Sequence, residues 1–358
     1  MTVLLTITIL ILTGIAVWQI TKIFELSQIG LKKDDSQIAT EKDNDLNGKL
    51  MFAFLVFIYL VTIYCFWAYT KVLLPESASE HGPIYDTLLW VSFAIILFAQ
   101  TITQAVLHYF AYKYRGINNR KAYFFTHDNK LELIWTVIPA IIFFVLIIYG
   151  MITWGQIMNF GEEDEDDLVV ELYAQQWNWK ARYGGLDNVL GDANVRFLND
   201  FDGKNAVGID SSDPNGMDDF VVTQEFHLPV NRKVIFKMRS QDVLHSAYMP
   251  HFRAQMNCVP GMITEFSFTP TITTEEMRQN SDVVAKVNRI NKIRYDKSQK
   301  LISKGEEGLD SYQFDYLLLC AKICGTSHFN MQMKIIVESE KDYKKWAVQQ
   351  QTFSEIIQ

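Results

Sequence analysis

Residues 133–161 read LIWTVIPAIIFFVLIIYGMITWGQIMNFG and contain no Asp, Glu, Lys or Arg. A helix of about 20 apolar residues crosses a hydrocarbon core of about 30 Å. The acidic run EEDEDD at 162–167 follows directly, and LVVELYA at 168–174 then has the composition of a β-strand. The chain is therefore expected to pass from a membrane helix into a polar domain near residue 162.

Three earlier stretches, 1–21, 51–70 and 87–112, also lack acidic and basic residues. Four transmembrane helices are thus predicted, which excludes a simple soluble enzyme. We expect the first to be retained as a helix, since it has neither a basic start nor a small-residue cleavage site. Glu132 directly precedes the last run. It is either an interfacial carboxylate or a proton-carrying group, since ionisable groups at membrane depth are costly and tend to be functional.

Basic residues in the connections predict the orientation. The connection 22–50 contains five lysines and 113–130 contains five Lys or Arg residues, whereas 75–86 contains none. Short cytoplasmic loops keep positive charge, so the first and third connections are expected inside. The N-terminus and the C-terminal domain then face outward.

The C-terminal domain is expected to be a β-sandwich, because several short extended runs alternate with turn signals. These runs lie at 168–174, 220–227, 232–238, 262–268, 314–319 and 333–338. A Gly-, Asn- and Asp-rich surface loop is predicted at 184–216 and an inserted helix at 273–304. A short closing helix is expected at 340–349.

The net charge of −8 argues against nucleic acid as a partner, because binding a polyanion requires a basic face. Most of the acidic excess lies after residue 161, where it either attracts a basic partner or is simply solvated. The four cysteines are too few for a disulfide scaffold in a chain of 358 residues.

Residues 320–331, CAKICGTSHFNM, place two thiols, an imidazole and a thioether within twelve positions. Thiolate and thioether ligands favour copper. A disulfide between Cys320 and Cys324 is the first alternative, but it leaves His328 and Met331 unexplained. Structural zinc is the second, but zinc sites make no use of Met. His245, in the stretch DVLHSAYMP at the end of an expected strand, offers a further imidazole.

Other histidines and possible haem ligands are less informative. His227 and His251 are expected to be ordinary surface or packed side chains. The motif Cys-x-x-Cys-His does not occur, so no covalently attached c-type haem is expected on this chain.

With these motifs the chain resembles subunit II of haem-copper cytochrome c oxidase, of a bacterial type with extra N-terminal helices. The resemblance covers about residues 86–347. It rests on LELIWTVIP at 131–139, QWNW at 176–179, DVLHS at 242–246, VPG at 259–261 and the cluster at 320–331. It implies a cupredoxin-like domain with a dinuclear copper centre, CuA.

The resemblance also implies a division of the chain. Residues 1–85 would form two extra transmembrane helices with a cytoplasmic loop, and 86–161 a transmembrane hairpin. Residues 162–358 would form an outward-facing cupredoxin domain with insertions at about 184–216 and 273–310. The extra segments favour a bacterial inner membrane, with this domain on the periplasmic side.

Residue roles follow from the resemblance alone. It implies that Cys320 and Cys324 bridge two coppers through their thiolates. His245 and Met331 would complete one copper. His328 and the main-chain carbonyl of Lys322 would complete the other.

Three further roles are implied. Trp177 matches the position that receives the electron, with a packed sandwich Trp as the alternative. Glu132 would lie at the mouth of a proton path, and Asp242 would help to dock the donor. Lys322 stands where the family has a Glu that binds magnesium shared with subunit I. Magnesium is therefore doubtful here, and we hypothesise that the Lys322 ammonium takes its place against carboxylates of subunit I.

The function implied is that of an electron receiver. Cytochrome c, or a c-type haem domain, would pass electrons to CuA. Haem in subunit I would then receive them for the reduction of oxygen to water coupled to proton translocation. Expected partners are subunit I, other oxidase subunits and the lipid membrane. The alternatives are a copper-free quinol oxidase subunit II and a CuA domain like that of nitrous oxide reductase.

Overall fold

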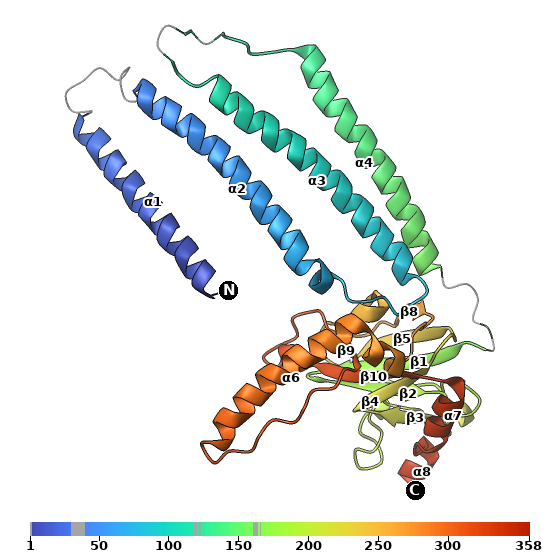
Figure 1. Ribbon diagram of the computed structural model, residues 1–358. Helices are drawn as coiled ribbons and strands as arrows, with labels where there is room; N and C mark the ends of the chain where they lie inside the picture. The colour runs from blue at the N-terminus through green and yellow to red at the C-terminus, as the bar shows by residue number, and fades with distance from the viewer. Residues whose placement is uncertain (1, 30–39, 118–119, 122, 160–163, 165) are drawn as a thin grey trace. The chain divides into compact units, whose positions relative to one another are not determined.

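The computed structural model describes residues 2–29, 40–117, 120–121, 123–159, 164 and 166–358. Its four long helices are α1 (Thr2–Ile29), α2 (Glu41–Leu73), α3 (Gly82–Lys113) and α4 (Asn129–Met158) (Figure 1). Each is long and apolar enough to cross a membrane, which confirms the four predicted spans. The expected change of character near residue 162 and part of the connection 22–50 lie outside the described residues.

Two five-stranded sheets form the C-terminal sandwich, as predicted. Their strand orders are β3-β2-β1-β5-β8 and β4-β10-β9-β6-β7. The strands are β1 (Leu168–Gln175), β2 (Asn178–Tyr183), β3 (Phe220–Val222), β4 (Glu225–Pro229), β5 (Val234–Ser240), β6 (His245–Met249), β7 (Ala254–Cys258), β8 (Thr264–Phe268), β9 (Tyr316–Cys320) and β10 (Gln332–Glu338). The pairs β1–β5 and β4–β10 are parallel, and the other pairs are antiparallel.

The strand prediction was wrong in two respects. The run 220–227 is not one strand, because β3 pairs with β2 in one sheet whereas β4 pairs with β10 in the other. The chain thus changes sheets at Thr223 and Gln224, in the middle of the predicted run. Strands β2, β6 and β7 were not among the predicted runs, and His245 begins β6 instead of ending a strand.

The helix expected at 273–304 is two helices, α5 (Thr274–Gln279) and α6 (Ser281–Ile302). Asn280 separates them because its backbone is extended and its side chain accepts the N–H groups of Asp282 and Val283, capping α6. The closing helix is confirmed as α7 (Glu340–Val348), and a short α8 (Phe353–Ile357) follows it.

The loop predicted at 184–216 is not wholly a surface loop. Val207 and Ile209 are buried and pack with Tyr173 of β1 and Phe353 of α8 in a small second core. Both of its short 3₁₀ helices, Val195–Phe197 and Pro214–Gly216, begin at an Asn or Asp side-chain cap. The loop therefore folds back onto the sandwich.

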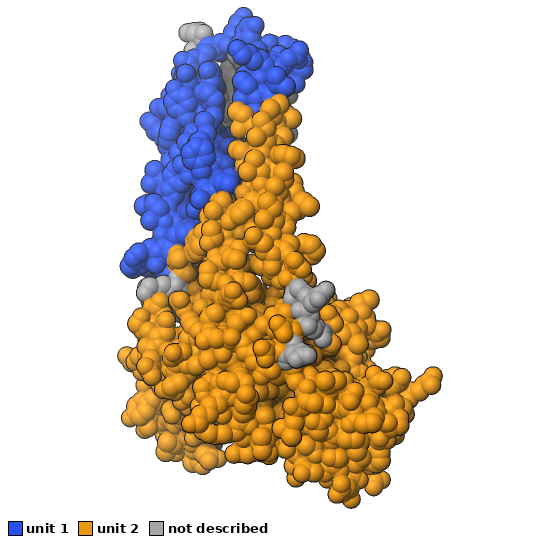
Figure 2. Space-filling model, turned by 90° about the vertical axis from the view of Figure 1, so that its right-hand side faces the viewer, with its two compact units in different colours: residues 1–68, 94–134 blue, residues 69–93, 135–358 orange. Residues whose placement is uncertain are grey.

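The described chain divides into two compact units, residues 1–68 with 94–134 and residues 69–93 with 135–358 (Figure 2). In the second unit the connection between α2 and α3 packs on the sandwich. Ala78 is fully buried in the main core, its N–H donates to the carbonyl of His251, and its carbonyl accepts the N–H of Thr271. The Arg253 guanidinium donates to both carboxylate oxygens of Asp86. The domain boundaries at 85/86 and 161/162 stay predictions.

Candidate metal centre

Neighbouring strands of one sheet position the cluster. Cys320 ends β9, and Cys324 lies in the loop that leads from β9 to β10. His245 begins β6, which pairs with β9 through Ala247 opposite Cys320. The ends of two adjacent strands thus bring together a histidine and a cysteine that are 75 residues apart in sequence.

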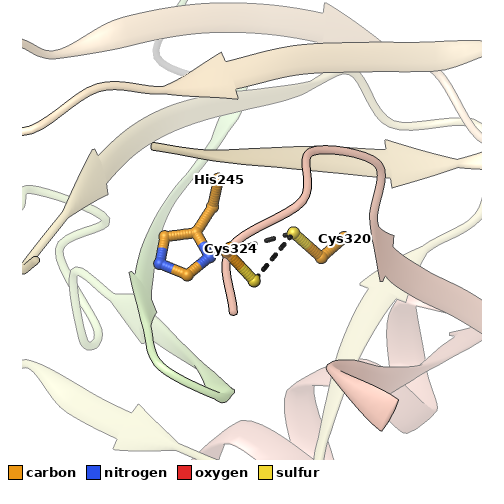
Figure 3. Close-up of side chains that lie close together, drawn as sticks. All are labelled: His245, Cys320 and Cys324. Carbon is orange, nitrogen blue, oxygen red and sulfur yellow. Dashed lines mark hydrogen bonds between the residues drawn. The ribbon is translucent and has the colours of Figure 1, made fainter. Parts of the chain in front are cut away.

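The two sulfur atoms lie at the centre of the cluster. Cys320 Sγ lies 3.8 Å from Cys324 Sγ and 3.8 Å from His245 Nδ1 (Figure 3). On the other side, Cys324 Sγ lies 3.6 Å from His328 Nδ1. Both cysteines are free and buried, and the ligand atoms of the two cysteines and His245 all lie within 4.8 Å of one another.

The remaining two predicted donors join the same cluster. Met331 Sδ lies 3.8 Å from Cys324 Sγ, and the main-chain oxygen of Lys322 lies 3.2 Å from Cys320 Sγ. Six donors therefore surround one small volume. A thioether among thiols and imidazoles fits copper and does not fit structural zinc.

Burial favours the neutral form of the thiols. The pKa of Cys324 is raised to about 11, first by burial and then by the adjacent Cys320. Two thiolates this close in a dry site are unfavourable without a cation, because removing charge from water is costly. A bound metal ion would reverse this preference, since coordination stabilises the thiolate.

Asp242 holds His245 in place. Its Oδ1 lies 2.8 Å from His245 Nε2 and accepts the Val243 N–H, while its Oδ2 accepts the Gln176 N–H. Burial opposes ionisation of Asp242, but these hydrogen bonds outweigh it and lower its pKa. With Nε2 facing the carboxylate, Nδ1 faces the sulfur atoms. The docking role predicted for Asp242 stays a prediction, but both its oxygens already have partners.

Trp177 lies in the turn between β1 and β2 with 38% of its surface exposed. The fully packed sandwich residue is instead Trp179, whose ring centroid lies 6.3 Å from that of His245. Gly325 has φ +130°, and a Cβ there would lie 3.0 Å from the Trp177 indole. The indole thus lies against the backbone of the ligand loop, an approach that requires glycine.

Sequence reasoning missed Gln176. Its side-chain amide donates to the carbonyl of Cys324 at 2.6 Å, and its backbone N–H binds Asp242. The turn that carries Trp177 is therefore tied to the cluster twice. The only sequence signal was that Gln176 directly precedes Trp177.

The other predicted residues lie apart from the cluster. Glu132 is in the first turn of α4, in the first compact unit, and its carboxylate lies 2.8 Å from His127 Nδ1. Lys322 and Ile323, on the ligand loop, are exposed. His227 stacks on Trp346 at 4.1 Å, as an ordinary packed histidine would.

A cupredoxin-like sandwich joined to membrane-length helices, with a buried cluster of soft ligands at one end, defines a class of membrane-anchored electron-transfer subunits. The family model for the cytochrome c oxidase subunit II transmembrane domain matches residues 71–152, and the model for its periplasmic domain matches 168–289. The chain belongs to the cytochrome c oxidase subunit II family.

Individual relatives agree. Alternative cytochrome c oxidase subunit 2 of Bradyrhizobium diazoefficiens is 30% identical over 289 residues, 80% of this chain and 86% of the relative. Cytochrome c oxidase subunit 2 of Cereibacter sphaeroides is 23% identical, over 75% of this chain and 77% of the relative. The periplasmic domain of subunit II of cytochrome oxidase of Bradyrhizobium japonicum superposes with a TM-score of 0.30 at 15% identity, covering 52% of this chain and 94% of that domain. A score this low adds nothing to the argument.

The family places this chain in the haem-copper oxidase complex as its subunit II, and the quinol oxidase alternative is not favoured. It is a multi-pass membrane protein with a periplasmic C-terminal domain.

Proposed function

We propose that this chain receives electrons one at a time at a CuA centre and passes them to haem in subunit I for the reduction of oxygen to water coupled to proton translocation. One observation carries the proposal: two free, buried thiols lie 3.8 Å apart, with two imidazoles, a thioether and a main-chain carbonyl around them. A copper-free subunit has no need of such a set.

In this proposal Cys320 and Cys324 would bridge two coppers. His245 with Met331 would complete one copper, and His328 with the Lys322 carbonyl the other. A dinuclear copper centre held by these residues would supply a group that takes up and releases one electron with little change in bond length. The chain contributes rigidity: strand β9 fixes Cys320, and Asp242 fixes the ring of His245. Burial keeps water from His245, Cys320, Cys324 and Met331.

Trp177 is proposed to receive the electron. Part of its indole is exposed to an incoming donor, and its other part lies against the backbone at Gly325, next to Cys324. The proposed donor is cytochrome c or a c-type haem domain. The hydrogen bond from Gln176 to the Cys324 carbonyl supports this role, because it keeps the indole and the ligand loop in one arrangement.

Two further roles are proposed away from the cluster. Glu132 would stand at the mouth of a proton path, since its half-exposed carboxylate begins a membrane helix beside His127. The exposed Lys322 would pair with carboxylates of subunit I where the family has a magnesium ligand. A complex with magnesium bound at Lys322 would contradict this second role.

The test of the CuA proposal uses the full-length chain, purified in detergent and supplied with copper. We expect about two coppers per chain and a purple chromophore. Cys324→Ser should abolish the colour, because one bridging thiolate is lost. Cys65→Ser is the matched control, because it removes a cysteine in α2, outside the cluster, and should leave the colour unchanged. A folded, copper-supplied chain that stays colourless would refute the proposal.

A further inference from the structure

Helix α6 extends outward from the sandwich (Figure 1). Only its first turns are anchored in the main core, where Val283 is buried and Val287 packs against the buried cluster. The family-model match to the periplasmic domain ends at residue 289, within this helix. Most of α6 therefore extends past the main core of the sandwich.

One face of α6 is occupied by its own chain. Asn291 exchanges two hydrogen bonds with the backbone of Tyr312, at 3.0 and 2.6 Å. Arg294 donates to the carbonyl of Asp310, and the Ser298 hydroxyl accepts the N–H of Leu309. The spacing of three and four residues places these three side chains on one side of the helix. The segment returning to β9 is thus fastened along that side.

The opposite face is basic and open. Lys286, Arg289, Ile293, Lys297 and Lys300 repeat at intervals of three and four residues, and all are exposed. We call these five residues the basic stripe; it extends for about 21 Å at 1.5 Å per residue. Two carboxylates border the stripe, since Asp282 lies four residues before Lys286 and Asp296 four residues before Lys300.

The charge of α6 contrasts with that of the chain. The helix has six Lys or Arg residues and two Asp residues, whereas the whole chain has a net charge of −8. With an excess of four positive charges, the helix attracts an acidic surface and repels a basic one. Ile293 in its middle, 64% exposed, supplies an apolar contact of the kind that a docked surface would bury.

A membrane surface fits this helix less well. Helices that lie on a membrane bury a continuous apolar face opposite their basic face. In α6 the opposite face carries Asn291 and Ser298, which hold the returning segment. We infer that the basic stripe of α6 docks an acidic surface of another protein on the periplasmic side. This inference does not depend on copper.

The test is photo-cross-linking in the assembled oxidase in its native membranes. A benzoylphenylalanine probe replaces Ile293, and the matched control probe replaces Tyr295, which is equally exposed at 64% but points to another face. We expect the probe at 293 to cross-link to a carboxylate-rich protein segment, identified by mass spectrometry, and the probe at 295 not to do so.

Charge reversal then tests the cause. The triple change Arg289→Glu, Lys297→Glu and Lys300→Glu should lower the cross-link yield from position 293 about tenfold, since three ion pairs are lost. Lysine-to-glutamate changes at Lys204, Lys341 and Lys344 alter the charge equally elsewhere and should leave the yield unchanged. Replacing the same three residues with Gln removes their charge without reversing it and should give an intermediate cross-link yield from position 293. These neutral variants also serve as a control for misfolding of the charge-reversed chain.

Several outcomes would overturn the inference. These are cross-links to lipid, to a second copy of this chain or to a protein segment without acidic residues, no product at all from position 293, and an unchanged yield after charge reversal. Copper content and colour, read on the same samples, report separately on the CuA proposal.

Discussion

Replacing Asp242 with Asn tests whether this carboxylate positions a metal ligand. The substitution keeps the shape but removes the charge, and it turns one acceptor oxygen into a donor NH₂ group. That group would then face either the Gln176 N–H or the His245 Nε2, both of which need an acceptor if Nε2 carries its proton. The ring of His245 loses its acceptor if the NH₂ group faces it, and keeps only a weaker, neutral acceptor if the NH₂ group faces Gln176.

The expected magnitude follows from the bonds lost. A hydrogen bond to a charged group contributes about 1.5–3 kcal/mol and a neutral one about 0.5–1.5 kcal/mol. Asp242→Asn should therefore weaken the support of His245 by about 1–2 kcal/mol. Loss of such a support for a ligand typically costs about 10–100-fold in metal affinity, and we expect the lower half of that range.

The assay is copper titration of the full-length chain against a competing chelator, with the visible spectrum recorded at each step. Asp310→Asn is the matched control, because it removes an exposed carboxylate from the same domain away from the cluster. If Asp242 serves only to dock the donor, copper affinity and spectrum stay unchanged, and KM for the donor rises in a salt-dependent way. That result would refute the positioning argument.

Three other perturbations have defined outcomes. Glu132→Gln should slow oxygen consumption by at least about tenfold with an intact copper spectrum, since a positioned proton-transfer group contributes about 10²–10⁴-fold and water can partly replace it. Unchanged turnover contradicts the proton role. Burial lowers the pKa of His251 to about 4. As pH falls, His251 is therefore protonated at a higher pH in the unfolded chain than in the folded one. The free energy of unfolding should fall by up to about 3 kcal/mol as pH falls from about 6.5 to 4. Denaturant unfolding of His251→Gln should show a flatter pH dependence in this window. Arg253→Met should destabilise the outer domain by about 3 kcal/mol, because the partly buried Asp86 loses its bidentate partner; chemical denaturation of the double variant with Asp86→Asn should recover part of this loss.

The helices could be predicted from the sequence because membrane spans depend on local composition. Twenty uncharged residues suffice, whatever lies around them. The strands were predicted less well, since short strands depend on their neighbours. Residues 254–258 read as AQMNC, with little β character, yet they form β7 because β6 pairs beside them. The division at Asn280 was visible only as a capping residue inside a helical pattern.

The metal cluster could be predicted largely because four of its donors lie within twelve positions. What the sequence did not reveal is how the cluster is supported. Gln176 and Asp242 are 66 residues apart, and no local pattern indicates that one donates to the other. The partners of a side chain across a sandwich depend on strand order, which the six predicted runs left undetermined.

The burial of Ala78 bears on how the protein is made. The outer domain completes its core with a segment that is synthesised some 90 residues before the domain's first strand. That segment reaches the periplasm only when α2 and α3 thread through the bilayer in the correct direction. A chain inserted the wrong way round would leave the main core without Ala78 and the Phe252 carbonyl without its hydrogen bond from Ser79. The outer domain can thus complete its core only in a chain whose helices α2 and α3 are inserted in the correct direction.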